Sequence, residues 1–201
     1  MSLTFDEATH RYFWNGTEVP SVTTVLRPLT DFSMIPADKL EIARQRGVAV
    51  HKMVELDAKG DLDEDALPEW LRPVLIKWRL FLAESGFKLF ESEHRVFSRR
   101  YNYAGTFDLF GELRGHYALI DVKRSFFAGP VIGMQTAAYS QAFAESEGDD
   151  PSSEVVRASV RRYALRLNEI GPYRLEPYTN KYDFQNFLTA LNFFRLKEKC
   201  K

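Results

Sequence analysis

Residues 104–123 read AGTFDLFGELRGHYALIDVK. The patterns at residues 104–113 and 117–122 are typical of β-strands, and Arg114-Gly115-His116 between them is a tight-turn signal. A third strand is predicted just before them, at residues 88–98, so that the three pair as a meander. This stretch therefore predicts a sheet at the centre of the fold.

Helical and extended patterns surround this stretch. Helices are predicted at residues 21–26, 37–59, 68–85, 131–145 and 183–199. Further strands are predicted at residues 3–6, 11–14, 154–167 and, from a weaker pattern, 174–178. Asn15-Gly16 is a hairpin turn signal, and residues 28–36 and 148–153 are expected to be loops. The sum is an α/β fold in which helices flank a central mixed sheet.

Composition sets limits on the domain organisation and on the chemistry. A chain of 201 residues with 45% hydrophobic and 14% aromatic residues suits one folded domain spanning residues 1–201. The lone cysteine, Cys200, allows neither an intrachain disulfide nor a cysteine-held zinc or iron–sulfur cluster. The sequence has neither a signal-peptide pattern nor a membrane-spanning pattern, which favours the cytoplasm and no membrane partner.

The net charge of −1 excludes a broadly basic nucleic-acid-binding surface, so a nucleic-acid site would have to be a local patch. No phosphate-binding loop of the Gly-x-x-x-x-Gly-Lys-Ser/Thr type occurs, so any motor activity would need a separate helicase.

Three charged residues on the central strands carry the chemical interpretation. Side chains at i and i+2 share one face of a strand, so Asp121 and Lys123 point the same way. If the two strands pair antiparallel, Asp108 lies near Asp121 on that face. Two close carboxylates suit Mg²⁺ or Mn²⁺, and the amine can offset negative charge on a phosphate, which together predict phosphodiester hydrolysis. The three residues alone leave open that Asp121 and Lys123 are only a surface ion pair.

A longer series of motifs resembles a known family. Gly105-Thr-Phe-Asp108, Asp121-Val-Lys123 and Gln135-Thr-Ala-Ala-Tyr139 follow one another in the order found in the PD-(D/E)xK nuclease superfamily, which has a restriction-endonuclease-like core. The Gln-x-x-x-Tyr element and the upstream helical sequence ending in His51 resemble the RecB-like exonuclease branch. Residues 20–26, PSVTTVL, are similar to the N-terminal stretch of mitochondrial genome maintenance exonucleases. Phe107 replaces the proline that gives the superfamily its name.

The resemblance implies a role for each motif residue. His51, Asp108, Asp121 and the Val122 carbonyl would bind Mg²⁺ or Mn²⁺, and Lys123 would be the catalytic lysine. Gln135 and Tyr139 would support the site or orient DNA, and Glu93 is preferred over Glu91 as an additional acid of the site. Glu55 is either a partner of His51 or a solvated helix charge.

Some of these residues also have structural interpretations. His51 could be a hydrogen-bonded packing residue, and Gln135 and Tyr139, one helical turn apart, could simply cap the edge of the core. The implied activity is a DNA exonuclease of recombination, repair or replication, similar also to phage-type exonucleases. The alternatives are a catalytically silent DNA-binding module and a structure-specific endonuclease. The implied partners are DNA that is single-stranded or has free ends, and a separate helicase or recombination protein.

Two arginine groups are candidates for DNA contact. Arg95, Arg99, Arg100 and Arg124 occur around the predicted strands together with Phe97, Tyr101 and Phe126, so that guanidinium groups would grip phosphates and rings would stack on unpaired bases. The second group is Arg157, Arg161, Arg162 and Arg166. Residues 154–167 could equally be an exposed edge strand whose arginines are solvated and discourage strand pairing.

Overall fold

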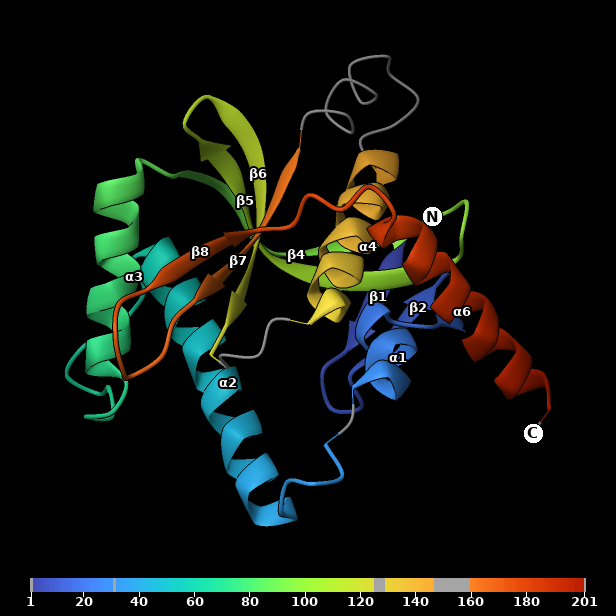
Figure 1. The fold of residues 1–201 in the computed structure, drawn as a ribbon, viewed down its shortest axis with the longest axis horizontal. Helices are drawn as coiled ribbons and strands as arrows, with labels where there is room; N and C mark the ends of the chain where they lie inside the picture. Colours follow the sequence, from blue (N-terminus) through green and yellow to red (C-terminus); the bar gives the residue numbers. More distant parts are fainter. Residues whose placement is uncertain (1, 31, 125–128, 147–159, 201) are drawn as a thin grey trace.

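A five-stranded mixed sheet forms the centre of the computed structural model, which describes residues 2–30, 32–124, 129–146 and 160–200. The strands are β4 (Lys88–Ser98), β5 (Tyr103–Leu113), β6 (His116–Lys123), β7 (Arg161–Arg166) and β8 (Arg174–Pro177), and they lie side by side in that order. Neighbours pair antiparallel except β6 and β7, which are parallel. The predicted α/β fold with a mixed central sheet is confirmed, as is the β4–β5–β6 meander (Figure 1).

Helices cover both faces of this sheet. The long helix α2 (Ala37–Lys59) and α3 (Arg72–Ser85) share one apolar cluster with Ile120 and Val122 of β6. The short helix α1 (Val22–Leu26), α4 (Pro130–Ser146) and α6 (Asp183–Lys199) share a second cluster with Leu119, on the opposite face. This alternation along β6 follows from the two-residue period of a strand.

A small N-terminal sheet packs beside β4 and β5. It consists of β1 (Leu3–Asp6), β2 (Arg11–Trp14) and β3 (Thr17–Val19), paired antiparallel in that order. Asn15 and Gly16 both have positive φ, 49° and 81°, as a two-residue hairpin turn of this twist requires. Trp14 stacks on Phe97 of β4 at 4.2 Å between ring centroids, and the Ala104 N–H donates to the Pro20 carbonyl at 3.0 Å. These contacts attach the small N-terminal sheet to the side of the main sheet.

Two helical segments differ from their predicted bounds. Helix α3 begins at Arg72 and not at residue 68, because Pro73 has no N–H for a helical bond to the residue four places earlier and is tolerated only in the first turn. A 3₁₀ turn, η1 (Arg27–Leu29), occupies the beginning of the segment for which the sequence predicts a loop.

The alternative that the strand predicted at residues 154–167 is an exposed edge strand is wrong for its described part. β7 covers Arg161–Arg166 and is bordered by β6 and β8, while residues 154–159 and the predicted acidic loop at 148–153 lie outside the described residues. Arg166 is 2% exposed, with its Nε 2.8 Å from Glu176. Arg162 is also largely buried, and its Nη1 lies 3.0 Å from Asp183 Oδ2 and donates to the Gly133 carbonyl at 2.7 Å. These two arginines therefore connect β7 to neighbouring elements and do not form an exposed basic run.

Within the described part of the chain, no helix combines the length and the apolar character that crossing a membrane would require.

Candidate metal and catalytic site

The central strands depart from regular geometry at Asp108. Phe107 belongs to the apolar cluster with α4 and Leu109 to the cluster with α2 and α3, although residues two apart in a regular strand share a face. The Asp108 carboxylate also accepts the Val122 N–H of β6 at 2.5 Å, in place of a backbone carbonyl. β5 therefore changes face at Asp108, and the carboxylate is held at the junction of the two strands.

The neighbouring strand is distorted at the same level. Glu93 lies between the paired residues Ser92 and His94 of β4, yet its φ is 49°, in the left-handed region. Such a conformation costs about 1–3 kcal/mol for a residue other than glycine and persists only where the surrounding structure enforces it. The consequence is that the Glu93 side chain points toward α2 and Asp108.

His51 of α2 completes a three-residue group. Its Nδ1 lies 3.2 Å from Asp108 Oδ1 and 4.0 Å from Glu93 Oε1. One ligating atom from each of His51, Glu93 and Asp108 lies within 4.8 Å of the others. An imidazole and two carboxylates from three different elements thus converge on one point. Asp121, which the resemblance implies as a metal ligand, lies outside this group, and Glu93, which it implies only as an additional acid of the site, lies inside it.

Asp121 and Lys123 lie next to this group, on one face of β6 as the strand period predicts. Lys123 Nζ is 2.7 Å from Asp121 Oδ2, and the Asp121 side chain is only 2% exposed. The alternative of a surface ion pair is therefore wrong. A carboxylate has about four lone-pair sites on its two oxygens, so the buried Asp121 keeps accepting capacity beyond its contact with Lys123.

The close acids perturb one another's protonation. Burial, reinforced by the charge of Asp108, raises the pKa of Glu93 to about 7. Burial likewise raises the pKa of Asp121 to about 6, against the opposing effect of the Lys123 ammonium. Burial alone would raise the pKa of Asp108, but the His51 imidazole, the Lys123 ammonium and the Val122 N–H together outweigh burial and lower it. Three carboxyl groups with few counter-charges are the electrostatic setting that a divalent cation relieves.

Gln135 and Tyr139 approach the acids from α4. The Gln135 amide donates to the Tyr139 hydroxyl at 3.2 Å, and Tyr139 is 3% exposed, with burial raising its pKa. Its ring lies against the backbone of Gly105, where the Cβ of any other residue would come within 2.4 Å of Tyr139 Cε1. Only glycine leaves room at that position of β5 for the ring.

A cleft of about 560 Å³ joins these groups. The predicted site residues that line it are His51, Glu55, Glu93, Arg95, Asp108, Asp121, Lys123, Gln135 and Tyr139. Glu55 forms ion pairs with Lys52 and Lys59 of its own helix at 2.9 and 2.6 Å. Those contacts favour the interpretation of Glu55 as a helix charge over that of a partner of His51.

The cleft has one wall that the sequence interpretation missed. Phe5, His10 and Tyr12 line it; they belong to the hairpin formed by β1, β2 and the turn between them, here called the N-terminal hairpin. The Tyr12 hydroxyl forms a hydrogen bond with Thr106 Oγ1 of β5 at 2.8 Å. The hairpin lies about a hundred residues from β5 in the sequence, so no local pattern connects the two.

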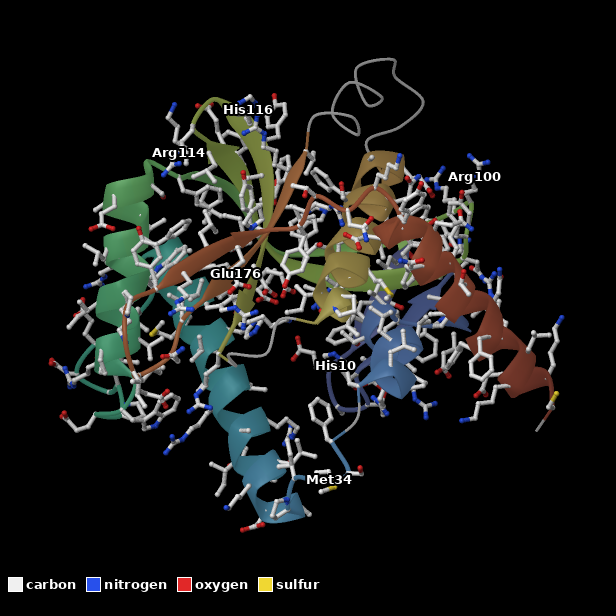
Figure 2. All side chains as sticks on the ribbon, in the orientation of Figure 1. His10, Met34, Arg100, Arg114, His116 and Glu176 are labelled. Atoms are coloured by element: carbon white, nitrogen blue, oxygen red, sulfur yellow. The ribbon has the colours of Figure 1, made fainter. Side chains whose placement is uncertain are left out.

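The expected DNA-contacting arginines are spread over different surroundings. Arg95 lines the cleft. Arg99 and Arg100 lie over the rings of Trp14 and Tyr101 at 5.6 and 5.4 Å and are not among the cleft residues, and Figure 2 shows Arg100 far from His10. Arg124 binds both carboxylate oxygens of Glu169, at 2.8 and 3.0 Å.

The two described aromatic residues expected beside these arginines are packed against other rings. Phe97 is 7% exposed and is covered by Trp14. Tyr101 is half-buried and packs edge-on against Phe184 at 5.3 Å. Phe126 lies outside the described residues. The strand pattern could not show this, because the two rings are covered by segments distant in the sequence.

Comparisons with known proteins leave the family of the chain open. No family model matches the sequence, and no curated protein matches it. Among solved structures, the chain is similar to LHK-Exo in complex with dAMP, with 8% identity, a TM-score of 0.39, and coverage of 90% of this chain and 88% of that one. It is also similar to the alkaline exonuclease LHK-Exo from Laribacter hongkongensis, with 10% identity, a TM-score of 0.31, and coverage of 90% and 92%. These values are too low to assign the chain to a family.

Proposed function

We propose that this chain hydrolyses phosphodiester bonds of DNA with the help of Mg²⁺ or Mn²⁺, acting as an exonuclease. The observation that carries the proposal is the convergence of His51, Glu93 and Asp108 within 4.8 Å, beside the buried Asp121–Lys123 pair, in one cleft. The sequence resemblance to RecB-like nucleases supports the same activity and fits a role in recombination, repair or replication.

The residues fit a hard divalent cation. Carboxylate oxygens are the ligands that Mg²⁺ and Mn²⁺ prefer, and a neutral imidazole is compatible with Mn²⁺. His51, Glu93 and Asp108 supply the three converging donors, and the Asp121 carboxylate, which keeps accepting capacity beyond its contact with Lys123, supplies a fourth nearby. By the resemblance, the Val122 carbonyl is a further ligand. When bound, the cation would acidify a water molecule and offset the charge of the phosphate.

Lys123 has the properties needed to act on the reacting phosphate. Burial alone would lower its pKa, but the Asp121 and Asp108 carboxylates outweigh this and raise it, so the amine stays protonated. A fixed ammonium in a cleft stabilises negative charge that builds up on a phosphate oxygen. Asp121 holds that ammonium in place at 2.7 Å.

Tyr139 and Gln135 are positioned to orient the substrate. Because the Tyr139 oxygen accepts from the Gln135 amide, its hydroxyl hydrogen is directed toward another acceptor. A phosphate oxygen in the cleft is a suitable one. The two residues would then fix the strand relative to Lys123 and contribute through orientation.

The test is digestion of end-labelled linear DNA, single- and double-stranded, with Mn²⁺ or Mg²⁺ and with or without a chelator. Covalently closed circular DNA distinguishes an exonuclease, which leaves circles intact, from a structure-specific endonuclease. We expect Lys123→Ala and Asp108→Asn to reduce cleavage at least ~100-fold, a magnitude typical of losing one preorganised charge at such a site. Circular dichroism would verify that each variant is folded.

The structure provides a matched pair of glutamates as a control. Glu93 belongs to the three-residue group, whereas Glu91, two residues earlier on β4, is about half exposed and lies 3.4 Å from His94 Nδ1. Glu93→Gln should abolish cleavage and Glu91→Gln should retain it. A folded parent that leaves all substrates intact would contradict the proposal and favour a silent DNA-binding module. A Lys123→Ala variant as active as the parent would contradict the role assigned to Lys123.

A further inference from the structure

The N-terminal hairpin presents an aromatic group at the cleft. Phe5 and His10 meet edge to face, with ring centroids 5.0 Å apart and planes at 83°. Tyr12 lies 4.6 Å from Phe5 and 6.4 Å from His10. Phe5 is half-buried and Tyr12 is 3% exposed, whereas His10 is exposed. The His10 ring is therefore the accessible member of the group, supported from behind by the other two rings.

The position of His10 is enforced by the turn that carries it. His10 has a φ of 55°, in the left-handed region. The turn is held by Asp6, whose carboxylate accepts the Ala8 N–H at 2.9 Å and the Thr9 hydroxyl at 2.7 Å. Tyr12, two residues after His10, bonds Thr106 of β5, which is itself two residues before Asp108. The exposed ring is thus fixed relative to the acids and is not on a free arm.

Arg95 adds a positive group beside these rings. Its guanidinium lies 5.0 Å from the centroid of Phe5, its Nη2 is 3.7 Å from the Glu7 carboxylate, and its side chain is 47% exposed. Arg95 is two residues beyond Glu93 on β4, or about 7 Å along the strand. A nucleic-acid chain with one phosphate at the acids would therefore pass Arg95 with a neighbouring nucleotide.

We propose that His10 and Arg95 form a binding subsite for one unpaired nucleotide of single-stranded DNA, with the base stacked on the His10 ring and a phosphate bound by Arg95. This inference rests on the proposed function, because it assumes that DNA occupies the cleft. An exposed ring beside an arginine is the combination with which proteins hold single strands irrespective of sequence. Bases inside a duplex have both faces covered by their neighbours, so the subsite selects a single strand or a frayed end.

The test is the binding of fluorescein-labelled 15-nucleotide single strands by the full chain, measured by fluorescence anisotropy with Ca²⁺ in place of Mg²⁺ or Mn²⁺. One abasic nucleotide is moved along the strand. In the parent, we expect one position, or two adjacent ones, at which loss of the base weakens binding about 5-fold or more, the effect of losing one stacked base. A blunt duplex should bind more weakly than the single strand.

Substitutions at His10 then identify the stacking ring. His10→Asn keeps the tolerance for positive φ and removes the ring, and His10→Phe keeps a ring. His10→Asn should weaken binding to intact strands by the same factor as the abasic nucleotide, and the two losses should not add. His10→Phe should bind like the parent. Arg95→Gln should weaken binding to all strands. It should also reduce the salt dependence of the binding constant by about the amount expected for one phosphate contact.

Matched controls come from the far end of the sheet. Arg114 lies in the turn between β5 and β6, and His116 is the first residue of β6. Both are away from His10 in Figure 2, and neither lines the cleft. His116→Asn and Arg114→Gln should bind every strand as the parent does.

The outcomes separate this inference from the proposed function. Non-additive losses from His10→Asn and the abasic nucleotide in a chain that never cleaves DNA would support the subsite and refute the nuclease. A parent that cleaves DNA, with His10→Asn binding all strands normally, would overturn the subsite and leave the nuclease intact. A parent that binds no strand would overturn both.

Discussion

Substituting Gly105 by alanine should destabilise the protein and disturb the site, because the ring of Tyr139 from α4 lies directly against the backbone of β5 there. A Cβ at Gly105 would lie 2.4 Å from Tyr139 Cε1, 3.1 Å from Tyr139 Cδ1 and 3.4 Å from Val22 Cγ2. Carbon atoms in ordinary contact are about 3.5–4.0 Å apart. The new methyl group would therefore be about 1 Å too close to the ring.

Neither partner has room to withdraw. Gly105 pairs with Val96 of β4, and the preceding Ala104 N–H is bonded to the Pro20 carbonyl at 3.0 Å. Tyr139 is 3% exposed, so its ring cannot swing into solvent without leaving the core. Overpacking of this kind costs about 1–3 kcal/mol, and the constraints on both sides place Gly105→Ala toward the upper end, at about 2–3 kcal/mol.

The assay is urea unfolding followed by circular dichroism, with a double-mutant cycle. Tyr139→Leu removes the ring that the methyl group would strike, so Gly105→Ala should cost less than about 0.5 kcal/mol in that background. Gly47→Ala is the contrasting glycine, because its Cβ would meet no atom within 4 Å and it lies inside α2, so it should stabilise by about 0.5–1 kcal/mol. Equal losses from Gly105→Ala with and without the Tyr139 ring would refute the reasoning.

Three further predictions concern the core, a buried ion pair and the cation. Trp78→Ala should lower the free energy of unfolding by about 3–5 kcal/mol, because Trp78 is 0% exposed, and a loss below about 1 kcal/mol in urea unfolding would contradict that burial. Asp183→Ala should cost about 3 kcal/mol and Asp183→Asn less, because both remove the charge that faces the Arg162 guanidinium but the asparagine amide oxygen can still accept its hydrogen bond; losses near zero for both would show that the pair contributes little. Mn²⁺ at about 100-fold above its dissociation constant should stabilise the parent by about 2.7 kcal/mol. Asp108→Asn should reduce that stabilisation. If Mn²⁺ raised the melting temperatures of the parent and of Asp108→Asn by the same amount, the ion would bind elsewhere.

Features that depend on near neighbours in the sequence were predicted well. The bounds of β1, β2, β4 and α2 agree with the structure, and β5 and β6 agree to within one residue at each end. Turn chemistry at Asn15-Gly16 and at Arg114-Gly115, where both residues again have positive φ, indicated both hairpins. The two-residue period of β6 put Asp121 and Lys123 on one face, because that period is a local property of an extended chain.

The acids of the site were less accessible to sequence reasoning. A regular β4 gives no reason to bring Glu93 to His51. The left-handed φ of 49° does so, and a residue other than glycine keeps such a conformation only where the surrounding tertiary structure enforces it. The change of face at Asp108 is of the same kind, since it depends on the hydrogen bond to Val122 of the next strand.

The sequence by itself determined which segments are helices and strands, where most of them turn, and which acids and amine lie along β6, because these depend on periods and turn residues within a few positions. The tertiary structure alone decided that β7 lies inside the sheet, that Glu93 joins His51 and Asp108, and that the hairpin bearing His10 forms a wall of the cleft. Those arrangements arise from contacts between segments tens of residues apart, whose energies no local pattern records.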